Sequence, residues 1–171
     1  VLRHDDTAVD TKNDIEIINT ELILADIQTI ENRLPKLHKE AKAKPAAREQ
    51  AGYLESLMRH LQSGTPLSAL PSVDHEAIAD LHLLTAKPVI YVFNVDENGL
   101  SDNTSQEHLR SMVAPAKSLF ASAKLEEELK GLSESDAKEL LESYGVEETG
   151  LMQLIHAAYD TLGLQSYLTA G

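Results

Sequence analysis

The sequence predicts an α/β fold that is mostly helical, with an incomplete α/β layer that carries an inserted helical hairpin. Two stripes of apolar residues spaced four and three apart indicate paired helices. A β-rich apolar run near residue 90, followed by a shorter one and by several amphipathic segments, indicates strands alternating with helices. Leu, Ile, Val and Ala must form most of the core, because Trp is absent and aromatic residues make up only 4% of the chain.

Residues 14–70 are predicted to form an antiparallel hairpin of coiled-coil type, preceded by a linker or truncated edge at 1–13. Asp14 is expected to cap the first helix, and Pro35 to kink or interrupt it. A break at Lys44-Pro45 separates the two helices. The stripes consist of Ile23, Ile27, Ile30, Leu34, Leu37 and Ala41 in the first helix, and of Ala47, Ala51, Leu54, Met58 and Leu61 in the second.

Residues 71–171 are predicted to form the α/β layer itself. A short helix at 74–86, capped by Asp74, leads into a buried strand at 88–95, and a second strand is expected at 117–121. The pattern predicts further helices at 105–113, 124–131, 135–144 and 151–162, and another possible strand at 165–171.

The strand at 88–95 delivers Asn94 and, three residues later, Glu97 to its C-terminal edge, where open α/β sheets bind ligands. An amide and a carboxylate at this spacing can grip a purine base, and the loop Ser122-Ala123-Lys124 can close over it. The residues alone leave an alternative open. Asn and Asp favour turns for local hydrogen-bonding reasons, and Ser122 is equally typical of a helix N-cap.

Composition narrows the function classes. The net charge of −13 argues against wholesale coating of nucleic acid, so DNA is not an expected partner. Cys is absent, which excludes disulfides, thiolate metal sites and a Cys nucleophile. The seven His residues show no metal-ligand spacing, so no metal site is predicted. No apolar run approaches 18 residues, and a soluble, cytoplasmic protein with no membrane partner is expected.

Five segments together resemble the Obg-like ATPase family, also called YchF, a branch of the translation-factor GTPases. They are Asp14-Ile-Glu-Ile-Ile-Asn-Thr-Glu-Leu22, Leu83-Leu-Thr-Ala-Lys-Pro-Val-Ile-Tyr91, Asn94-Val-Asp-Glu97, Ser122-Ala-Lys-Leu-Glu126 and Leu164-Gln-Ser-Tyr-Leu-Thr-Ala-Gly171. Each segment is short, but together they occur in the family's order and span almost the whole chain from Asp14.

The resemblance implies a P-loop nucleotide-binding domain with an inserted coiled-coil hairpin and a C-terminal TGS domain. This chain then matches the middle portion: the hairpin at 14–70 and the C-terminal half of the nucleotide-binding domain at 71–171. The longer protein would be a nucleoside-triphosphate hydrolase, an ATPase or GTPase that acts as a ribosome-associated regulatory switch. The sequence contains no G-x-x-x-x-G-K-[ST] motif. Mg²⁺ would therefore be held by residues outside this chain, which alone is not expected to be active.

The resemblance also assigns the base site. Asn94 and Glu97 would act through their side chains, Val95 through its main chain, and Ser122 and Ala123 as the closing loop. Ordinary GTPases carry Asn-Lys-x-Asp, whereas here Val95 replaces the Lys and Glu97 the Asp. In the family, Asn-x-x-Glu is associated with accepting adenine, so the resemblance implies that ATP is favoured over GTP. The physical interpretation agrees, because an acid displaced by one methylene no longer fits the guanine edge. No catalytic residue is identified.

The tip of the hairpin is locally basic, with Lys36, Lys39 and Lys42 as its central charges. Such a run is usually a solvated helix face. In a family associated with ribosomes, contact with rRNA phosphate is the functional interpretation. Two alternatives to the ATPase remain: a non-enzymatic helical adaptor with a degenerate nucleotide site, and a GTP-specific switch, which Glu97 and Val95 disfavour.

Overall fold

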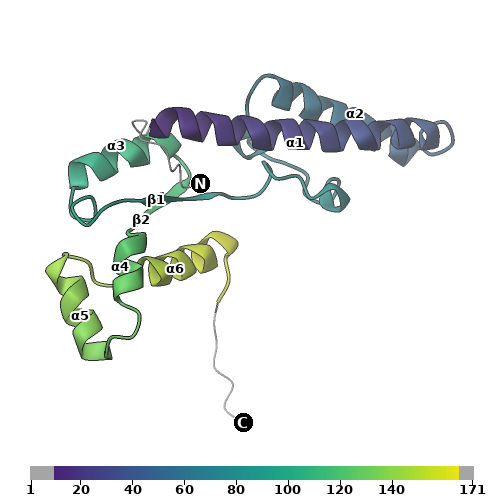
Figure 1. The fold of residues 1–171 in the computed structure, drawn as a ribbon. Helices are drawn as coiled ribbons and strands as arrows, with labels where there is room; N and C mark the ends of the chain where they lie inside the picture. Colours follow the sequence, from purple (N-terminus) through teal and green to yellow (C-terminus); the bar gives the residue numbers. More distant parts are fainter. Residues whose placement is uncertain (1–9, 166–171) are drawn as a thin grey trace, which may run out of the picture. The chain divides into compact units, whose positions relative to one another are not determined.

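The computed structural model describes residues 10–165, which divide into two compact units on either side of the Lys87–Pro88 peptide bond. Unit 1 precedes this bond and unit 2 follows it. Unit 1 contains α1 (Thr11–Glu40), α2 (Pro45–Gln62) and two 3₁₀ turns, η1 (Leu67–Ala69) and η2 (Ala79–Leu81) (Figure 1). Unit 2 contains β1 (Ile90–Asn94), α3 (Asn103–Val113), β2 (Lys117–Ala121), α4 (Ala123–Glu128), α5 (Glu134–Ser143) and α6 (Gly150–Leu162). The α/β, mostly helical fold is confirmed.

Helix α1 begins earlier than the sequence predicts and does not stop at its proline. Asp10, not Asp14, is the N-cap, and its Oδ1 accepts a hydrogen bond from the backbone N–H of Asn13 at 3.1 Å. Residues 11–13 are therefore helical rather than part of a linker. Pro35 lies inside the helix, which continues to Glu40, so the predicted interruption is wrong. Pro35 is exposed, and water can serve a carbonyl freed on an exposed face.

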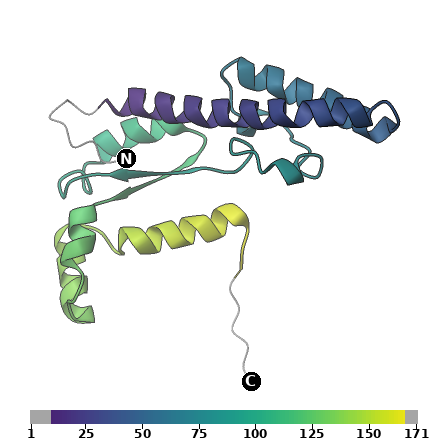
Figure 2. The ribbon, with the colours of Figure 1, turned by 45° about the vertical axis from the view of Figure 1, so that its right-hand side comes forward.

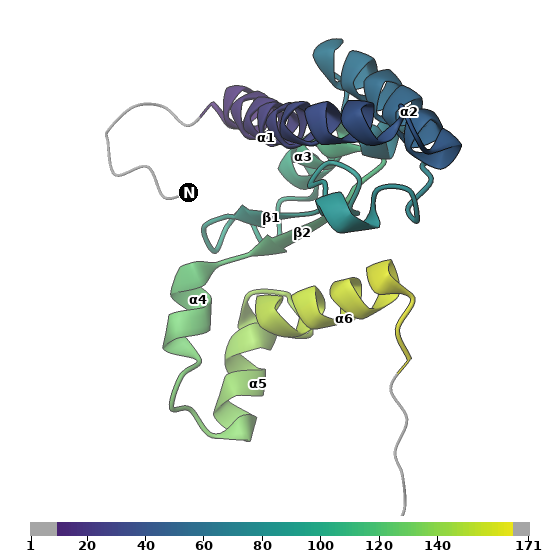
Figure 3. The same cartoon turned by 90° about the vertical axis from the view of Figure 1, so that its right-hand side faces the viewer.

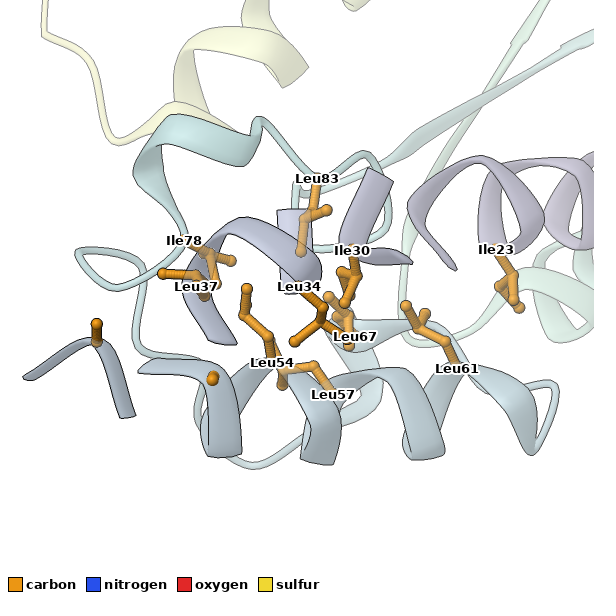
Figure 4. Packing of buried hydrophobic residues seen from close by; sticks show 12 residues of the cluster. Ile23, Ile30, Leu34, Leu37, Leu54, Leu57, Leu61, Leu67, Ile78 and Leu83 are labelled. Atoms are coloured by element: carbon orange, nitrogen blue, oxygen red, sulfur yellow. The ribbon is translucent and has the colours of Figure 1, made fainter. Parts of the chain in front are cut away.

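Helices α1 and α2 pack against each other and form the core of unit 1. Pro45 occupies the first turn of α2, where its missing N–H costs nothing. Leu57 is buried, whereas Met58, assigned to the stripe from the sequence, is only partly buried. Figure 4 shows the apolar side chains gathered between the helices and the segment that follows them. The buried cluster contains Ile23, Ile30, Leu34, Leu37, Ala47, Ala51, Leu54, Leu57, Leu61, Leu67, Ile78 and Leu83.

Leu67, Ile78 and Leu83 in this cluster come from the segment after α2. The core is therefore not a seam between two helices alone. The antiparallel helical hairpin is present, while its coiled-coil character stays a prediction.

The helix predicted at 74–86 is wrong. The segment forms turns and the short 3₁₀ turn η2. Asp74 does act as a local cap, because its Oδ1 accepts from the backbone N–H groups of Glu76 and Ala77, both at 3.1 Å. The chain then leaves helical geometry at His82, whose φ of 51° lies in the left-handed region.

A buried carboxylate of α1 holds the end of this segment. Asp26 of α1 is only 1% exposed, and its Oδ1 accepts from the backbone N–H of Leu84 at 2.7 Å. Its Oδ2 accepts from the N–H of Thr85 at 2.8 Å and from the Thr85 hydroxyl at 2.7 Å. Side-chain bonds to backbone amides compete with helical ones. Asp26 thus fixes the bend and turn at 84–87 against α1.

The sheet of unit 2 has two parallel strands among the described residues, with Ile90 opposite Lys117 and Asn94 opposite Ala121 (Figures 1 and 2). Helix α3 makes the crossover between them. The rings of Phe93 and Phe120 stack with their centroids 5.3 Å apart. The strand predicted at 117–121 is confirmed. The prediction that β1 is buried is wrong for the described part of the chain, because Val92 is 47% exposed.

The helices predicted at 105–113, 124–131, 135–144 and 151–162 are confirmed as α3, α4, α5 and α6, with ends shifted by a few residues. The last three follow β2 in succession (Figure 3). Helix α6 begins very close to β2: a Cβ at Gly150 would lie 2.5 Å from the Cβ of Ala121. The backbone N–H of Gly150 donates to Glu126 Oε1 at 2.6 Å. The strand predicted at 165–171 lies outside the described residues, except for Gln165.

Candidate nucleotide-base site

The carboxyl ends of β1 and β2 bring four of the predicted site residues together. Asn94 is the last residue of β1, and its Oδ1 accepts from the backbone N–H of Ala123 at 3.0 Å. The N–H of Val95 donates to the carbonyl of Ala121 at 2.9 Å, which extends the strand pairing by one step. Ser122 lies between these two links. Residues distant in sequence therefore share one edge of the sheet.

The hydrogen bond to Ala123 orients the Asn94 carboxamide. A backbone N–H can only donate, so the atom that faces it must be the amide oxygen. The Nδ2 group then points the other way, and it has no partner within residues 10–165. Asn94 is exposed. The edge of the sheet thus presents an N–H donor to an incoming ligand.

Glu97 joins the same cluster through an ion pair. Its Oε1 accepts from Nζ of Lys124 at 2.5 Å, and its side chain is 22% exposed. Lys124 also lies 3.9 Å from Glu128 one turn along α4. The hydrogen bond from Lys124, together with one from its own backbone N–H, holds the pKa of Glu97 below its usual value. The same bond raises the pKa of Lys124, so both groups stay charged near neutrality.

The loop that carries Glu97 is held at several points. Asp96 Oδ1 accepts from the N–H of Gly99 at 2.8 Å, which is the turn that Asp favours. The loop is tight here, since a Cβ at Gly99 would lie 2.8 Å from the Cβ of Val95. Gln106 of α3 donates from Nε2 to the carbonyls of Gly99 and Leu100, both at 2.9 Å. The turn expected as the alternative to a base site is therefore present, and it does not exclude a ligand site in the same loop.

The closing loop is built as a helix start. Ser122 is 3% exposed, and its Oγ accepts from the N–H of Leu125 at 3.3 Å. This is the N-cap geometry, so the Ser122 side chain is committed to α4. The N–H of Ala123 is committed to Asn94. Any ligand would therefore meet Asn94 and Ala123 as a linked pair.

Two residues of this cluster were missed from the sequence, Lys124 and Gln106. Lys124 was included in the closing loop without a role for its side chain. Lys124 and Glu97 carry opposite charges and follow two adjacent parallel strands. This combination is a signal that could have revealed the ion pair. Gln106 offered no such signal, because its partners are backbone carbonyls.

The hairpin tip presents the three predicted lysines. Lys36 and Lys39 lie near the end of α1, Lys42 lies in the turn before α2, and all three are exposed. None of them forms an ion pair with another residue in the described range 10–165. The neighbouring contact, from His38 Nε2 to Glu55 Oε1 at 3.3 Å, does not involve them. Their charges are left to interact with solvent or a partner.

Among the described residues, no group of three or more His, Cys, Asp or Glu gathers in a metal-binding arrangement. In the same range, no helix has both the length and the apolar content needed to cross a membrane.

The fold of this chain is similar to that of a solved GTPase. The solved structure of the Schizosaccharomyces pombe YchF GTPase matches the whole of this chain with a TM-score of 0.81 and 26% sequence identity, and the match covers 49% of that protein's chain. No family model matches the sequence.

Curated relatives carry the same name. Ribosome-binding ATPase YchF of Bacillus subtilis (strain 168) is 37% identical over 99% of this chain, and that of Escherichia coli O157:H7 is 36% identical over 95%. This chain spans about half the length of these relatives, 49% and 46% respectively. It is homologous to one portion of the YchF proteins, and the resemblance to the Obg-like ATPase family is confirmed.

Proposed function

We propose that this chain is the base-recognition half and the coiled-coil hairpin of a nucleotide-binding ATPase that prefers ATP to GTP. The observation that supports the proposal most directly is the cluster at the carboxyl ends of β1 and β2. There Asn94 is bonded to Ala123, and Glu97 is bonded to Lys124. Ligands of open α/β sheets bind at this edge.

The donor and acceptor pattern of the cluster suits adenine. The Nδ2 group of Asn94 donates to a ring nitrogen of a purine, and the carboxylate of Glu97 accepts from an amino group. Adenine carries an exocyclic amine at the position where guanine carries a carbonyl oxygen. A carboxylate facing that carbonyl would be repelled, so Glu97 favours ATP.

Hydrolysis belongs to the longer protein. The sequence contains no G-x-x-x-x-G-K-[ST] phosphate-binding loop, so these residues do not supply the cradle for the phosphates and their Mg²⁺. The remainder of the protein would hold Mg²⁺ and the phosphates and stabilise the charge of the transferring phosphoryl group. This chain selects the base, and we place the protein in the cytoplasm as a switch that associates with ribosomes.

The base site is tested in the full-length protein by Asn94→Ala, with Asn98→Ala as the matched control. Asn98 is an exposed Asn in the same loop, and its only contact given by the structure is through its main-chain carbonyl. We expect Asn94→Ala to weaken ATP binding about tenfold, since one hydrogen bond is worth about 1.5 kcal/mol. Calorimetric titration measures this. If Asn94→Ala leaves the ATP affinity unchanged, the base-site proposal is wrong and the non-enzymatic adaptor is favoured. If the unmodified protein binds GTP more tightly than ATP, the GTP-specific switch is favoured instead.

The hairpin tip is proposed to contact ribosomal RNA. The supporting observations are its three unpaired lysines and the similarity to relatives named ribosome-binding ATPase YchF. Changing Lys36, Lys39 and Lys42 to Glu should reduce ribosome co-sedimentation. The slope of the logarithm of the binding constant against the logarithm of the salt concentration should become less steep by about 0.7–0.9 per lost phosphate contact. The control is the same charge change at Lys87, Lys130 and Lys138, which are also exposed. If the two triple variants behave alike, the tip is only a solvated face.

A further inference from the structure

The ion pair between Glu97 and Lys124 connects the two loops that border the base site. Glu97 lies in the loop after β1, and Lys124 lies in the first turn of α4 after β2. Their charged atoms are 2.5 Å apart. A second link, from Asn94 to Ala123, joins the same two segments through the main chain. The two links differ in kind, because only the ion pair depends on a side chain of the closing loop.

Local contacts hold the two backbone segments that carry Glu97 and Lys124. On one side, Gln106 and the Asp96–Gly99 turn hold the loop that carries Glu97. On the other side, the Ser122 cap and the buried Leu125, which is 3% exposed, hold the start of α4. The bases of both side chains are therefore fixed. The ion pair decides where the carboxylate of Glu97 points, because a free Glu side chain has several rotatable bonds.

We propose that Lys124 is a positioning residue for base selection: it anchors one oxygen of Glu97 and aims the remaining acceptor capacity of that carboxylate at the amino group of an aminopurine. A carboxylate has about four lone-pair sites, so one bond to Lys124 leaves acceptors for a ligand. The same orientation of the Glu97 carboxylate places its negative charge where a 6-oxopurine carries its carbonyl oxygen. The inference rests on the proposed nucleotide function.

An ordinary surface ion pair is the competing explanation. Exposed pairs contribute little to stability, and Lys124 is 71% exposed. An ordinary pair, however, has no reason to change which base is bound. A matched example is the exposed pair of Glu127, near the end of α4, with Lys130, which follows α4. The two pairs can be compared in one protein.

The experiment measures dissociation constants for ATP and GTP with the full-length protein carrying Lys124→Met, Lys124→Arg or Lys130→Met. We expect Lys124→Met to lower the preference for ATP over GTP about fivefold to tenfold, which corresponds to losing one aimed hydrogen bond. Lys124→Arg should retain most of the preference, because it keeps the charge. Lys130→Met should leave the preference unchanged, and all three variants should melt near the unmodified protein.

Glu97→Gln supplies the second half of the test. If Lys124 acts through Glu97, Lys124→Met should change the ATP preference of the Glu97→Gln protein little, which is the signature of coupled residues. An unchanged preference in Lys124→Met, or equal loss in Lys124→Met and Lys124→Arg, would overturn the positioning role.

Failure of this inference can be told apart from failure of the proposed function. If Asn94→Ala weakens nucleotide binding while Lys124→Met leaves the preference intact, only the role of Lys124 is wrong. If neither substitution affects nucleotide binding, the base site itself is wrong.

Discussion

The two units of this protein are stabilised in different ways. In unit 1, Ile30, Leu54 and Leu67 are completely buried and belong to a continuous apolar cluster. In unit 2, fewer residues are buried and many large apolar side chains remain exposed. These are Val89, Val92, Leu132, Leu151, Met152, Ile155, Tyr159, Leu162 and Leu164.

Unit 2 has directional polar contacts around the candidate site. Asn94, Glu126 and Gln106 each bond a backbone group of another segment. Apolar burial is non-directional and sets how stable a unit is. Hydrogen bonds have defined geometry and set where a group points. The comparison indicates that unit 1 is organised for stability and the site edge of unit 2 for position.

The largest effect that tests this comparison is expected from Leu54→Ala in α2. Leu54 is 0% exposed, so the substitution creates a cavity in the cluster and should cost about 2–5 kcal/mol of unfolding free energy. Leu24→Ala is the control, because Leu24 is 58% exposed on α1. Denaturant unfolding of both variants measures the difference. Similar costs for the two would show that the cluster does not dominate the stability of unit 1.

A smaller effect is expected from Asp26→Ala. This substitution leaves the N–H groups of Leu84 and Thr85 without an acceptor, which should cost about 1–3 kcal/mol. Asp26→Asn should restore only part of the loss, because its amide oxygen can accept from one backbone N–H while its NH₂ group would face the other. Glu31→Ala on the exposed face of α1 is the control. A loss no larger than that of Glu31→Ala, measured by thermal unfolding, would mean that Asp26 does not secure the segment.

The smallest effect concerns pH and sharpens the account of unit 2. Lys124 holds the pKa of Glu97 below its usual value, so the ion pair is intact above that usual value and is lost as the pH falls through the lowered pKa. Carbon NMR titration of side-chain carboxyl groups should show the pKa of Glu97 rising toward normal in Lys124→Met. Asp102 serves as an internal control, because Ser105 lowers its pKa. If both pKa values move together, the change in Glu97 is not specific to Lys124.

The sequence predicted the helical hairpin and the strand at 117–121 because their patterns are local. It also placed Asn94 and Glu97 at the carboxyl edge of a strand. It could not predict that Asp26 would lie in the apolar stripe of α1, since a charged residue is buried only when distant backbone donors satisfy it. The bonds to those donors, in Leu84 and Thr85, hold the end of the segment predicted as a helix at 74–86 in a bend and a turn.

The exposure of β1 could not be predicted from the sequence, for a related reason. A run such as 88–95 has the composition of a buried strand, but burial depends on which neighbours cover it. Within residues 10–165, β2 is the only strand beside it. The ion pair of Glu97 with Lys124 likewise depends on the parallel register of two strands, which no local pattern states.

The close approach at Gly150 has a consequence for anyone who wishes to engineer this protein. Replacing a helical glycine by alanine normally stabilises a helix by up to about 1 kcal/mol, so a design based on propensity would choose this position in α6. Here the added methyl group would lie 2.5 Å from the Cβ of Ala121, which is fixed to the backbone of β2 and cannot rotate away. The usual sign of the substitution is therefore reversed, and alanine at this position would push α6 off the strand that leads into the closing loop.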